Sequence, residues 1–470
     1  MKLTGFLFAA ALLGSCTQPA AEENYTRHVD PKIGTGGHGH VFVGANVPFG
    51  LVQVGPTSIP QTWDWCSGYH ASDSTVIGFS HTHLSGTGIG DLFDVTVMPV
   101  TGDVTYARGE EADPASGLWS YADRTQEIAR PGYYSVPLTR YGIRAELTAT
   151  ARVGLHRYTF PASDAAAVVF DLENGGCWDK ATETHLAKEG DRTVTGWRHS
   201  TGWAKNQEVY FVAEFSKPAK GISYLQPGEI DDSKMPRIAA RYARVDFDTA
   251  EGEQVLVKVA LSPVSIEGAK ANLAAELPGW DFDATAAAAD KAWNDELSKV
   301  KIETEDETSK RIFYTALYHT MVAPSLFCDV NGDYRGADGK VHENPGRDTY
   351  TTFSLWDTYR AAMPLMTVLH PERMPDIIQT MLHIADEQGR LPVWHLWGNE
   401  TDCMVGNPGI VAVADAIVKG IGGFDREKAF ETIRKTAMNP DRGNGLRMEY
   451  GYIPCEMFNE AVAYDMEYAL

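Results

Sequence analysis

The chain has 470 residues, of which 43% are hydrophobic and 22% are charged, and its formal net charge at pH 7 is −22. This composition is typical of a globular protein with roughly two to four domains and excludes a mainly disordered chain. The excess of acidic residues argues against a nucleic-acid partner, because phosphate binding depends on clustered lysine and arginine.

The first sixteen residues have the features of an export signal. Lys2 supplies a positive charge, and residues 3–13 form an apolar run too short to span a bilayer stably. Leu13-Gly14-Ser15-Cys16 resembles the bacterial lipoprotein box, in which the cysteine is lipidated and becomes the new N-terminus. We expect residues 1–16 to be a lipoprotein signal peptide. The mature protein would lie in the periplasm or on the outer-membrane surface, with acyl chains on Cys16 as its only membrane attachment. A plain signal peptide is the alternative.

The other five cysteines, at positions 66, 177, 328, 403 and 455, are scattered and include no Cys-x-x-Cys pair. This spacing supports neither a zinc ribbon nor a thioredoxin motif. A chain of this length can bury a sufficient core without cross-links, so we expect no disulfide framework.

Alternating apolar residues predict strands in the first part of the chain. Residues 147–155 and 209–215 are apolar at every second position, and the apolar run 255–261 is closed by Pro263. An apolar residue at every second position is typical of strands with one buried face. We expect residues 25–270 to form an N-terminal β-sandwich of many strands.

The periodicity becomes helical near residue 280. The alanine-rich segment 283–297 predicts a linking helix within a linker of residues 271–305. Apolar residues then recur at helical spacing in four groups, which are Phe313, Leu317 and Met321; Ile377, Met381 and Ala385; Ile410, Val413 and Ile417; and Phe430, Ile433 and Ala437. Short connections between such helices suit antiparallel neighbours. We expect an α+β multidomain protein in which residues 306–470 form part of an α/α toroid.

Aromatic and acidic residues gather in residues 394–409, just ahead of a predicted helix. Trp394, His395, Trp397 and Glu400 lie close together there. Aromatic faces cover the apolar side of a pyranose ring, and a carboxyl group beside an indole can have its pKa raised and remain protonated. The cluster predicts a sugar site with Glu400 as the general acid.

Trp356 and Asp357 form a second candidate sugar-binding pair. A carboxylate can accept hydrogen bonds from two adjacent sugar hydroxyls while a neighbouring indole stacks on the C–H face. The alternative is a helix start, in which Trp356 belongs to the core and Asp357 pairs with Arg360.

A third candidate lies in the β-rich part, where Trp63 and Trp65 precede His81 and His83. In a strand the two histidines would point the same way, which is compatible with a metal pair. No cysteine or carboxylate stands at a regular metal-ligand spacing, so loop aromatics and histidines closing over a sugar are the favoured interpretation. The glycine-rich segment 34–40 lacks the Lys-Ser/Thr of a phosphate loop and is interpreted as a loop that shapes the cleft.

Several motifs together, in order along the chain, resemble glycoside hydrolase family 92, the exo-acting α-mannosidases. They are Asp30-Pro31-Lys32-Ile33-Gly34-Thr35-Gly36-Gly37, Asn46-Val47-Pro48-Phe49-Gly50, Trp65-Cys66-Ser67-Gly68-Tyr69, Phe79-Ser80-His81, Phe353-Ser354-Leu355-Trp356-Asp357-Thr358 and Gly398-Asn399-Glu400-Thr401. The resemblance implies a β-sandwich, a linker and an (α/α)6 catalytic barrel. It also implies inverting, calcium-dependent hydrolysis of terminal α-linked mannose, most often α-1,2, from glycans.

Roles for individual residues follow from the matched motifs. The resemblance implies that Glu400 protonates the leaving oxygen, and that Trp356 and Asp357 hold the terminal mannose. Trp63 or Trp65 would reach the sugar from the N-terminal domain.

A looser match places Asn459 and Glu460 near calcium and the mannose 2- and 3-hydroxyls. In the family, calcium bound to these hydroxyls acts as a Lewis acid and template.

An inverting glycosidase also needs a second carboxylate, roughly 6.5 to 9.5 Å from the acid, to activate water. In the family this base lies in a motif well downstream of the acid, whereas this sequence ends at Leu470. Asp402 and Asp465 are acidic but lie outside that motif. We therefore expect about half a barrel without the general-base segment, and an inactive 470-residue chain. The alternatives are a non-catalytic mannan-binding lipoprotein and an inverting glycoside phosphorylase of another toroid family.

Overall fold

The computed structural model describes residues 23–60, 62–225, 240–344 and 346–469. The predicted signal peptide, with Cys16, lies outside these ranges. Within them, no helix has both the length and the apolar character needed to cross a membrane. The described cysteines are free thiols.

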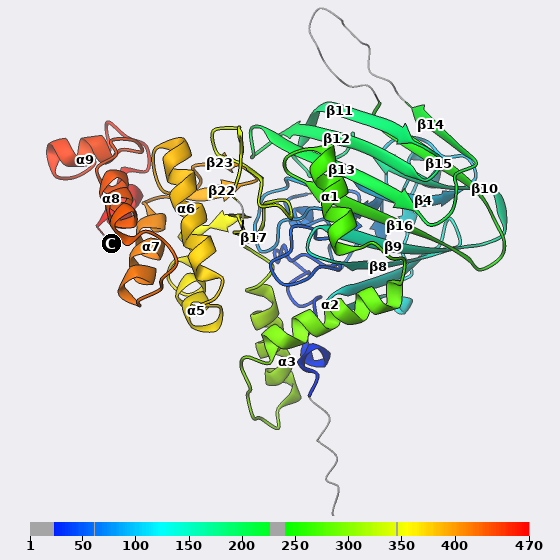
Figure 1. The fold of residues 1–470 in the computed structure, drawn as a ribbon, viewed down its shortest axis with the longest axis horizontal. Coiled ribbons are helices and arrows are strands. Elements are labelled where there is room, and N and C mark those ends of the chain that lie inside the picture. Colours follow the sequence, from blue (N-terminus) through cyan, green and yellow to red (C-terminus); the bar gives the residue numbers. More distant parts are fainter. Residues whose placement is uncertain (1–22, 61, 226–239, 345, 470) are drawn as a thin grey trace, which may run out of the picture.

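Two antiparallel sheets form the sandwich that the sequence predicts, and Figure 1 shows them on one side of the molecule. The first has the order β1 (Gly55–Thr57), β3 (Gly78–Ser80), β4 (Thr96–Thr101), β10 (Ser163–Asp171), β15 (Tyr242–Thr249) and β14 (Gly221–Leu225). The second has the order β11 (Lys180–Glu189), β12 (Thr193–Thr201), β13 (Gln207–Phe215), β16 (Glu253–Ser262), β9 (Val153–Phe160), β8 (Ile143–Ala149), β7 (Tyr133–Leu138) and β6 (Ile128–Arg130).

The alternating residues of 209–215 lie in β13 and are buried, which confirms that prediction. The segment 147–155 is different, because β8 ends at Ala149 and β9 begins at Val153. The N–H of Thr150 donates to the carbonyl of Val153 over 2.8 Å and closes a turn. The apolar alternation therefore continues through a chain reversal and belongs to two strands.

Helix α1 (Ile266–Glu276) covers the outer face of the second sheet. Ser265 caps it by accepting a hydrogen bond from the N–H of Gly268 over 3.0 Å. Ala269 and Leu273 pack with Val212 of β13 and with further residues of β9 and β16. The boundary predicted at residue 270 thus falls inside a helix that packs on the sandwich.

Helices α2 (Phe282–Leu297) and α3 (Glu307–His319) follow, beside the 3-10 helix η1 (Tyr25–His28). Helix α2 is fixed to the sandwich side because the Trp293 indole donates to the carbonyl of Asn46 over 2.7 Å. The apolar face predicted for the following helix, formed by Phe313, Leu317 and Met321, is partly wrong. Helix α3 buries Tyr314, Leu317 and Tyr318 and ends before Met321.

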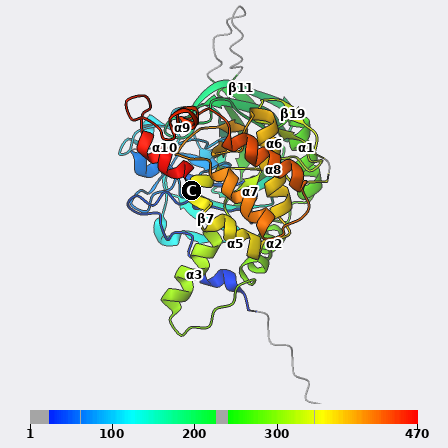
Figure 2. The ribbon, with the colours of Figure 1, turned by 90° about the vertical axis from the view of Figure 1, so that its left-hand side faces the viewer.

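The helical domain lies on the other side of the molecule, and Figure 2 shows its helices in front of the sandwich. It contains α4 (Leu355–Thr358), α5 (Ala362–Leu369), α6 (Met374–Gln388), α7 (Pro408–Val418), α8 (Arg426–Ala437), α9 (Asn444–Tyr450) and α10 (Ala461–Tyr468). The predicted face of α6 is buried, as expected. In α7 the central position of the predicted stripe, Val413, is fully buried. The face predicted for α8 is partly wrong: Ile433 packs against the core, but Phe430 is 58% exposed, and Ala429 and Thr436 are buried instead.

Short elements complete the fold. They are β2 (Thr75–Val76), β5 (Ser120–Tyr121), β17 (Ser325–Leu326), β18 (Tyr334–Arg335), β19 (Val341–His342), β20 (Tyr350–Thr351), β21 (Phe353–Ser354), β22 (Trp394–Leu396), β23 (Asn399–Glu400), and the 3-10 helices η2 (Trp63–Trp65), η3 (Pro114–Ser116) and η4 (Arg124–Gln126). Strands β21, β22 and β23 form one sheet that positions the candidate site.

Candidate active site

The small sheet of β21, β22 and β23 brings together two of the predicted site motifs. Ser354 at the end of β21 pairs with Trp394 of β22, and β22 pairs in turn with the strand that carries Glu400. Helix α4 begins directly after β21 and carries Asp357. Residues some forty positions apart in the sequence therefore lie side by side.

A cavity of about 240 Å³ lies beside this sheet, between the sandwich and the helical domain. The sandwich contributes residues 85–87 to its wall. The helical part contributes polar groups from Asp357 and His319, the Trp394 side chain, and apolar surface from Met363. A concave site with a few polar groups among apolar and aromatic ones is typical of small-molecule binding.

Asp357 is exposed at the cavity, and one of its oxygens, Oδ2, accepts a hydrogen bond from the Ser354 hydroxyl. Arg360, its alternative partner, lies 3.4 Å from Glu467 through Nη2 and Oε1. Trp356 is half-buried and does not line the cavity, and among the described residues its indole N–H has no hydrogen-bond partner. Asp357 is therefore the member of the predicted pair that faces the cavity.

His319, at the end of α3, is a cavity residue that the sequence did not single out. Burial lowers the pKa of its imidazole to about 4, so the ring is neutral near pH 7. Its Nε2 is buried and finds no partner in the described part of the chain. A neutral imidazole at this position can donate to or accept from a ligand hydroxyl.

Glu400 lies on β23, next to the main chain of Trp394 on β22. Its Oε1 accepts from the N–H groups of Trp394 and Asp402 over 2.9 and 3.0 Å, and its Oε2 accepts from the N–H of Val393 over 2.8 Å. Glu400 is not itself among the lining residues. The carboxyl group is thus held by backbone N–H groups, one of them from Trp394, a residue of the cavity wall.

Trp63 and Trp65 lie together in the 3-10 helix η2 of the N-terminal domain. The Trp63 indole donates to the carbonyl of Gly88 over 2.7 Å and packs edge-on against His40, with 4.2 Å between ring centroids. The carbonyl of His40 in turn accepts from the N–H of Gly86, which lines the cavity. Trp65 stacks on His70 instead, at 4.4 Å. Trp63 is the one of the two that supports the cavity edge.

His81 and His83 do not form a metal pair. Both are buried, and the Nδ1 atom of each lies within hydrogen-bond distance of a backbone carbonyl, at 2.6 Å from Val95 and 2.8 Å from Gln53. The Nε2 atom of His81 lies 2.9 Å from that of His156. These rings belong to the hydrogen-bonded interior of the sandwich and do not line the cavity, so the expectation that they close over a sugar is also wrong.

Asn459 and Glu460, the residues expected near calcium, lie in an exposed turn that precedes α10. Neither lines the cavity. Together they offer an amide and a carboxylate, whereas calcium takes six to eight oxygen ligands. The described residues therefore do not complete a calcium site at this position.

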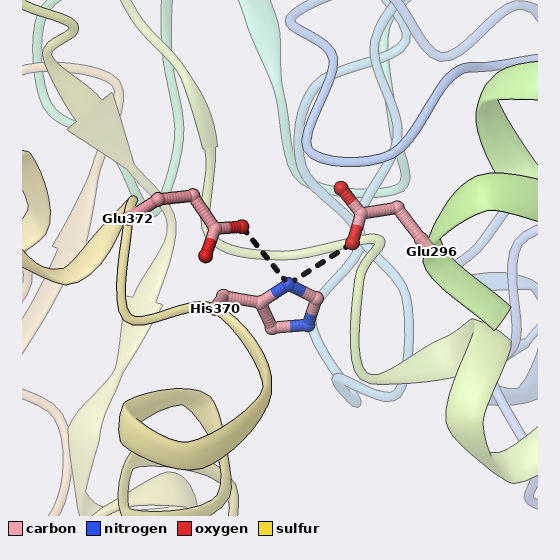
Figure 3. A group of neighbouring side chains, drawn as sticks. All are labelled: Glu296, His370 and Glu372. Carbon is pink, nitrogen blue, oxygen red and sulfur yellow. Dashed lines mark ion pairs between the residues drawn. The ribbon is translucent and has the colours of Figure 1, made fainter. Parts of the chain in front are cut away.

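One other group of side chains has metal-ligand geometry within the described ranges. Glu296, His370 and Glu372 converge between α2 and the segment after α5, as Figure 3 shows. Lys299 lies among them, with its Nζ at 2.7 Å from Glu296, 2.9 Å from Glu372 and 3.2 Å from His370. Burial alone would raise the pKa of Glu296, but hydrogen bonds from His370 and Lys299 hold it well below its usual value. The ammonium group thus takes the place of a metal ion.

Comparison with known proteins agrees with this architecture. The chain matches the glycosyl hydrolase family 92 N-terminal domain over residues 28–262 and the family 92 catalytic domain over residues 268–470. The chain belongs to glycosyl hydrolase family 92. The first family domain ends at the last residue of β16, and the second begins in the first turn of α1.

Solved structures of the family are similar along almost the whole chain. A family 92 α-mannosidase from Bacteroides thetaiotaomicron is 38% identical, with a TM-score of 0.90 over 95% of this chain and 61% of that one. The same enzyme has also been solved in complex with mannoimidazole. A family 92 inverting mannosidase from this species is 28% identical, with a TM-score of 0.83 over 96% of this chain and 61% of that one.

A curated relative from Arthroderma benhamiae, described as an uncharacterized secreted glycosidase, is 26% identical over 493 residues. The match covers 96% of this chain and 58% of the relative. The chain thus spans about three fifths of the length of these relatives, between 58% and 61%.

Proposed function

We propose that the protein is a glycoside hydrolase that removes terminal non-reducing α-linked mannose from glycans, with inversion. The observation that carries this proposal is the convergence of Trp394 and Glu400 on one small sheet, with Asp357 on the helix that follows it, beside a cavity between the two domains of a family 92 chain. Mannosidase names among the similar structures support the sugar. Membership of a hydrolase family argues against the phosphorylase alternative.

In this proposal Asp357 accepts hydrogen bonds from mannose hydroxyls, and Trp394 covers an apolar face of the ring. Glu400 gives its proton to the glycosidic oxygen as the bond from that oxygen to C1 breaks. Water forms the new bond to C1 from the opposite face and gives its proton to a second carboxylate, so the anomeric configuration inverts. Among the described residues we assign no base, because the nearby Asp402 is paired with Arg390 and Arg442.

The same proposal includes three more specific properties: the linkage preference, calcium dependence and attachment to the cell envelope. We infer a preference for α-1,2 linkages and a dependence on calcium from family membership alone, and no step above passes through the metal. When bound, calcium would supply Lewis-acid polarisation of sugar hydroxyls. Attachment to the cell envelope through Cys16 rests on the lipobox, and the word secreted in the name of the fungal relative agrees with export.

The deciding experiment compares two substrates with the full-length protein and its Glu400→Gln variant. An α-1,2-linked mannobiose needs its leaving group protonated, whereas 2,4-dinitrophenyl α-mannoside does not. We expect the variant to lose at least 100-fold in kcat on the disaccharide and less than tenfold on the aryl mannoside. Equal losses on the two substrates would remove Glu400 from the acid role.

The binding-protein alternative is tested with the same material. It requires that the unaltered protein bind mannobiose without releasing mannose. Turnover that stops in the presence of EDTA and returns with calcium supports the enzyme and the metal together. Turnover that persists in EDTA contradicts the calcium dependence but not the proposed hydrolase activity.

A further inference from the structure

The loop between β12 and β13, residues 202–206, projects from the sandwich toward the sheet that carries Glu400. It contacts that sheet at two points. Trp203 packs against Trp394 with ring centroids 4.5 Å apart, and Asn206 pairs with Asn399, the residue before Glu400. Two segments almost two hundred residues apart therefore meet beside the proposed acid.

The contact with Asn399 is reciprocal. The N–H of Asn206 donates to Asn399 Oδ1 over 3.0 Å, and Asn399 Nδ2 donates to the carbonyl of Asn206 over 2.9 Å. The side-chain amide of Asn399 thus binds the main chain of Asn206 as a neighbouring strand would. A pair of parallel hydrogen bonds of this kind fixes orientation as well as distance.

The hairpin of β22 and β23 has a strained turn that contacts with the sandwich loop can stabilise. Its two-residue turn places Trp397 and Gly398 at φ values of 47° and 77°, and the left-handed region is unfavourable for a bulky side chain. Strain of this kind persists only where the surroundings impose it. Asn399 Nδ2 also donates to the carbonyl of Trp397 over 2.8 Å, so the same amide connects the sandwich loop to the strained turn.

The loop itself is firmly placed. Asp91, buried in the sandwich, accepts the N–H of Ala204 through Oδ2 over 2.9 Å. A side chain at position 202 would lie 2.1 Å from the other oxygen of Asp91, so glycine is needed there for this close approach. At the start of β13, Glu208 lies 2.9 Å from Arg335 of the helical domain. The loop is therefore held in place and can fix the position of the hairpin that it contacts.

We propose that Asn399 and Trp203 are positioning residues for Glu400, through which the N-terminal sandwich sets the place of the general acid. This inference rests on the function proposed above for Glu400. Trp394 links Trp203 to Glu400. Its indole packs against Trp203, and its backbone N–H donates to Glu400 Oε1 over 2.9 Å. Displacement of the hairpin moves the carboxyl group relative to the leaving oxygen, and small displacements of a catalytic group cost large factors in rate.

The test uses Asn399→Ala, Asn399→Asp, Trp203→Ala and Trp203→Phe in the full-length protein, with Lys205→Ala as the matched control on an exposed residue of the same loop. We expect Asn399→Ala and Trp203→Ala to lower kcat on α-1,2-mannobiose about tenfold or more, with KM changed less than twofold. On 2,4-dinitrophenyl α-mannoside each should lose less than twofold. Trp203→Phe should recover most of the loss, and Lys205→Ala should match the unaltered protein.

Hydrogen exchange gives a second readout that does not require turnover. Asn399→Ala and Asn399→Asp should speed exchange of the amides that bind Glu400, those of Val393, Trp394 and Asp402, about tenfold or more, and Lys205→Ala should not. Unchanged exchange, or equal kinetic losses on both substrates, would overturn the positioning role. If the unaltered protein turns over neither substrate, the proposed function fails, and the exchange rates still decide whether the loop holds the hairpin.

Discussion

Arg198 and Asp94 form an ion pair inside the sandwich, with 2.7 Å between Nη1 and Oδ1 and both side chains fully buried. The same guanidinium group also contacts Asp179. Arg198→Met would leave two buried carboxylates without their counter-charge, and we expect it to lower the free energy of unfolding by about 3 to 5 kcal/mol. Denaturant unfolding measures this loss.

Two further variants isolate the charge effect. Adding Asp94→Asn and Asp179→Asn to Arg198→Met should recover more than half of the loss, because no uncompensated charge remains. The surface variant Arg434→Met should cost less than about 1 kcal/mol, since its pair with Glu431 is exposed. A triple variant no more stable than Arg198→Met would contradict the electrostatic explanation.

Asp91 should make stability depend on pH. Burial, with the nearby charge of Asp179, raises its pKa to about 7, whereas an unfolded chain releases this proton near pH 3.9. Between these values the folded protein keeps a proton that the unfolded chain gives up. The folded state therefore loses stability as the pH rises from about 4 to 7, by up to about 4 kcal/mol.

Asp91→Asn stays neutral and retains an oxygen for the N–H of Ala204. We expect the variant to be more stable than the unaltered protein at pH 8 and close to it at pH 4.5, in denaturant unfolding at the two values. A stability difference that is the same at both would show that the Asp91 proton does not cause it.

Gly202→Ala tests the close approach of the sandwich loop to Asp91. The new methyl group would lie 2.1 Å from Asp91 Oδ1, so the loop must shift, and we expect a loss of about 1 to 3 kcal/mol. Gly279→Ala is the control, because nothing lies within 4 Å of its added methyl group. Thermal unfolding of the two variants in parallel measures the difference. Equal melting temperatures would show that the loop adjusts freely.

Asp357→Asn should weaken productive sugar binding. Hydrogen bonds from hydroxyls to a charged group contribute about 1.5 to 3 kcal/mol each, so we expect kcat/KM on mannobiose to fall at least tenfold. Ser354→Ala, which removes the hydroxyl that donates to Asp357, should have a smaller effect. Steady-state kinetics at a fixed calcium concentration compare the two. A larger effect of Ser354→Ala would place the sugar contact elsewhere.

Lys299→Ala should turn the side chains of Figure 3 into a metal site. Without the ammonium group, Glu296, His370 and Glu372 retain an imidazole and two carboxylates in convergent positions, which suits Zn²⁺. We expect isothermal titration calorimetry to give at least tenfold tighter Zn²⁺ binding than in the unaltered protein. Adding Glu372→Gln should remove the gain. Equal Zn²⁺ affinity with and without Lys299 would contradict the view that lysine occupies the cation position.

Local patterns in the sequence predicted much of the fold. The alternation in β13 and the helical stripe of α6 identified buried faces correctly, because both faces pack against a continuous core. The alternation across residues 147–155 was misleading, since a tight turn can preserve it. In α8 the bulky Phe430 suggested the wrong face, because smaller side chains fit against α6 and α7.

The sequence by itself determined the chemistry available to this protein: the indoles, the carboxylates near positions 357 and 400, and the motifs of the family. It could do so because residue type, spacing and motif order are properties of the chain. Tertiary structure decided which of these groups meet. Asp357 faces the cavity while Trp356 does not, His319 joins the wall, and Asn206 of the sandwich binds Asn399. Such contacts depend on how two domains pack, and packing joins residues whose separation along the sequence carries no local signal.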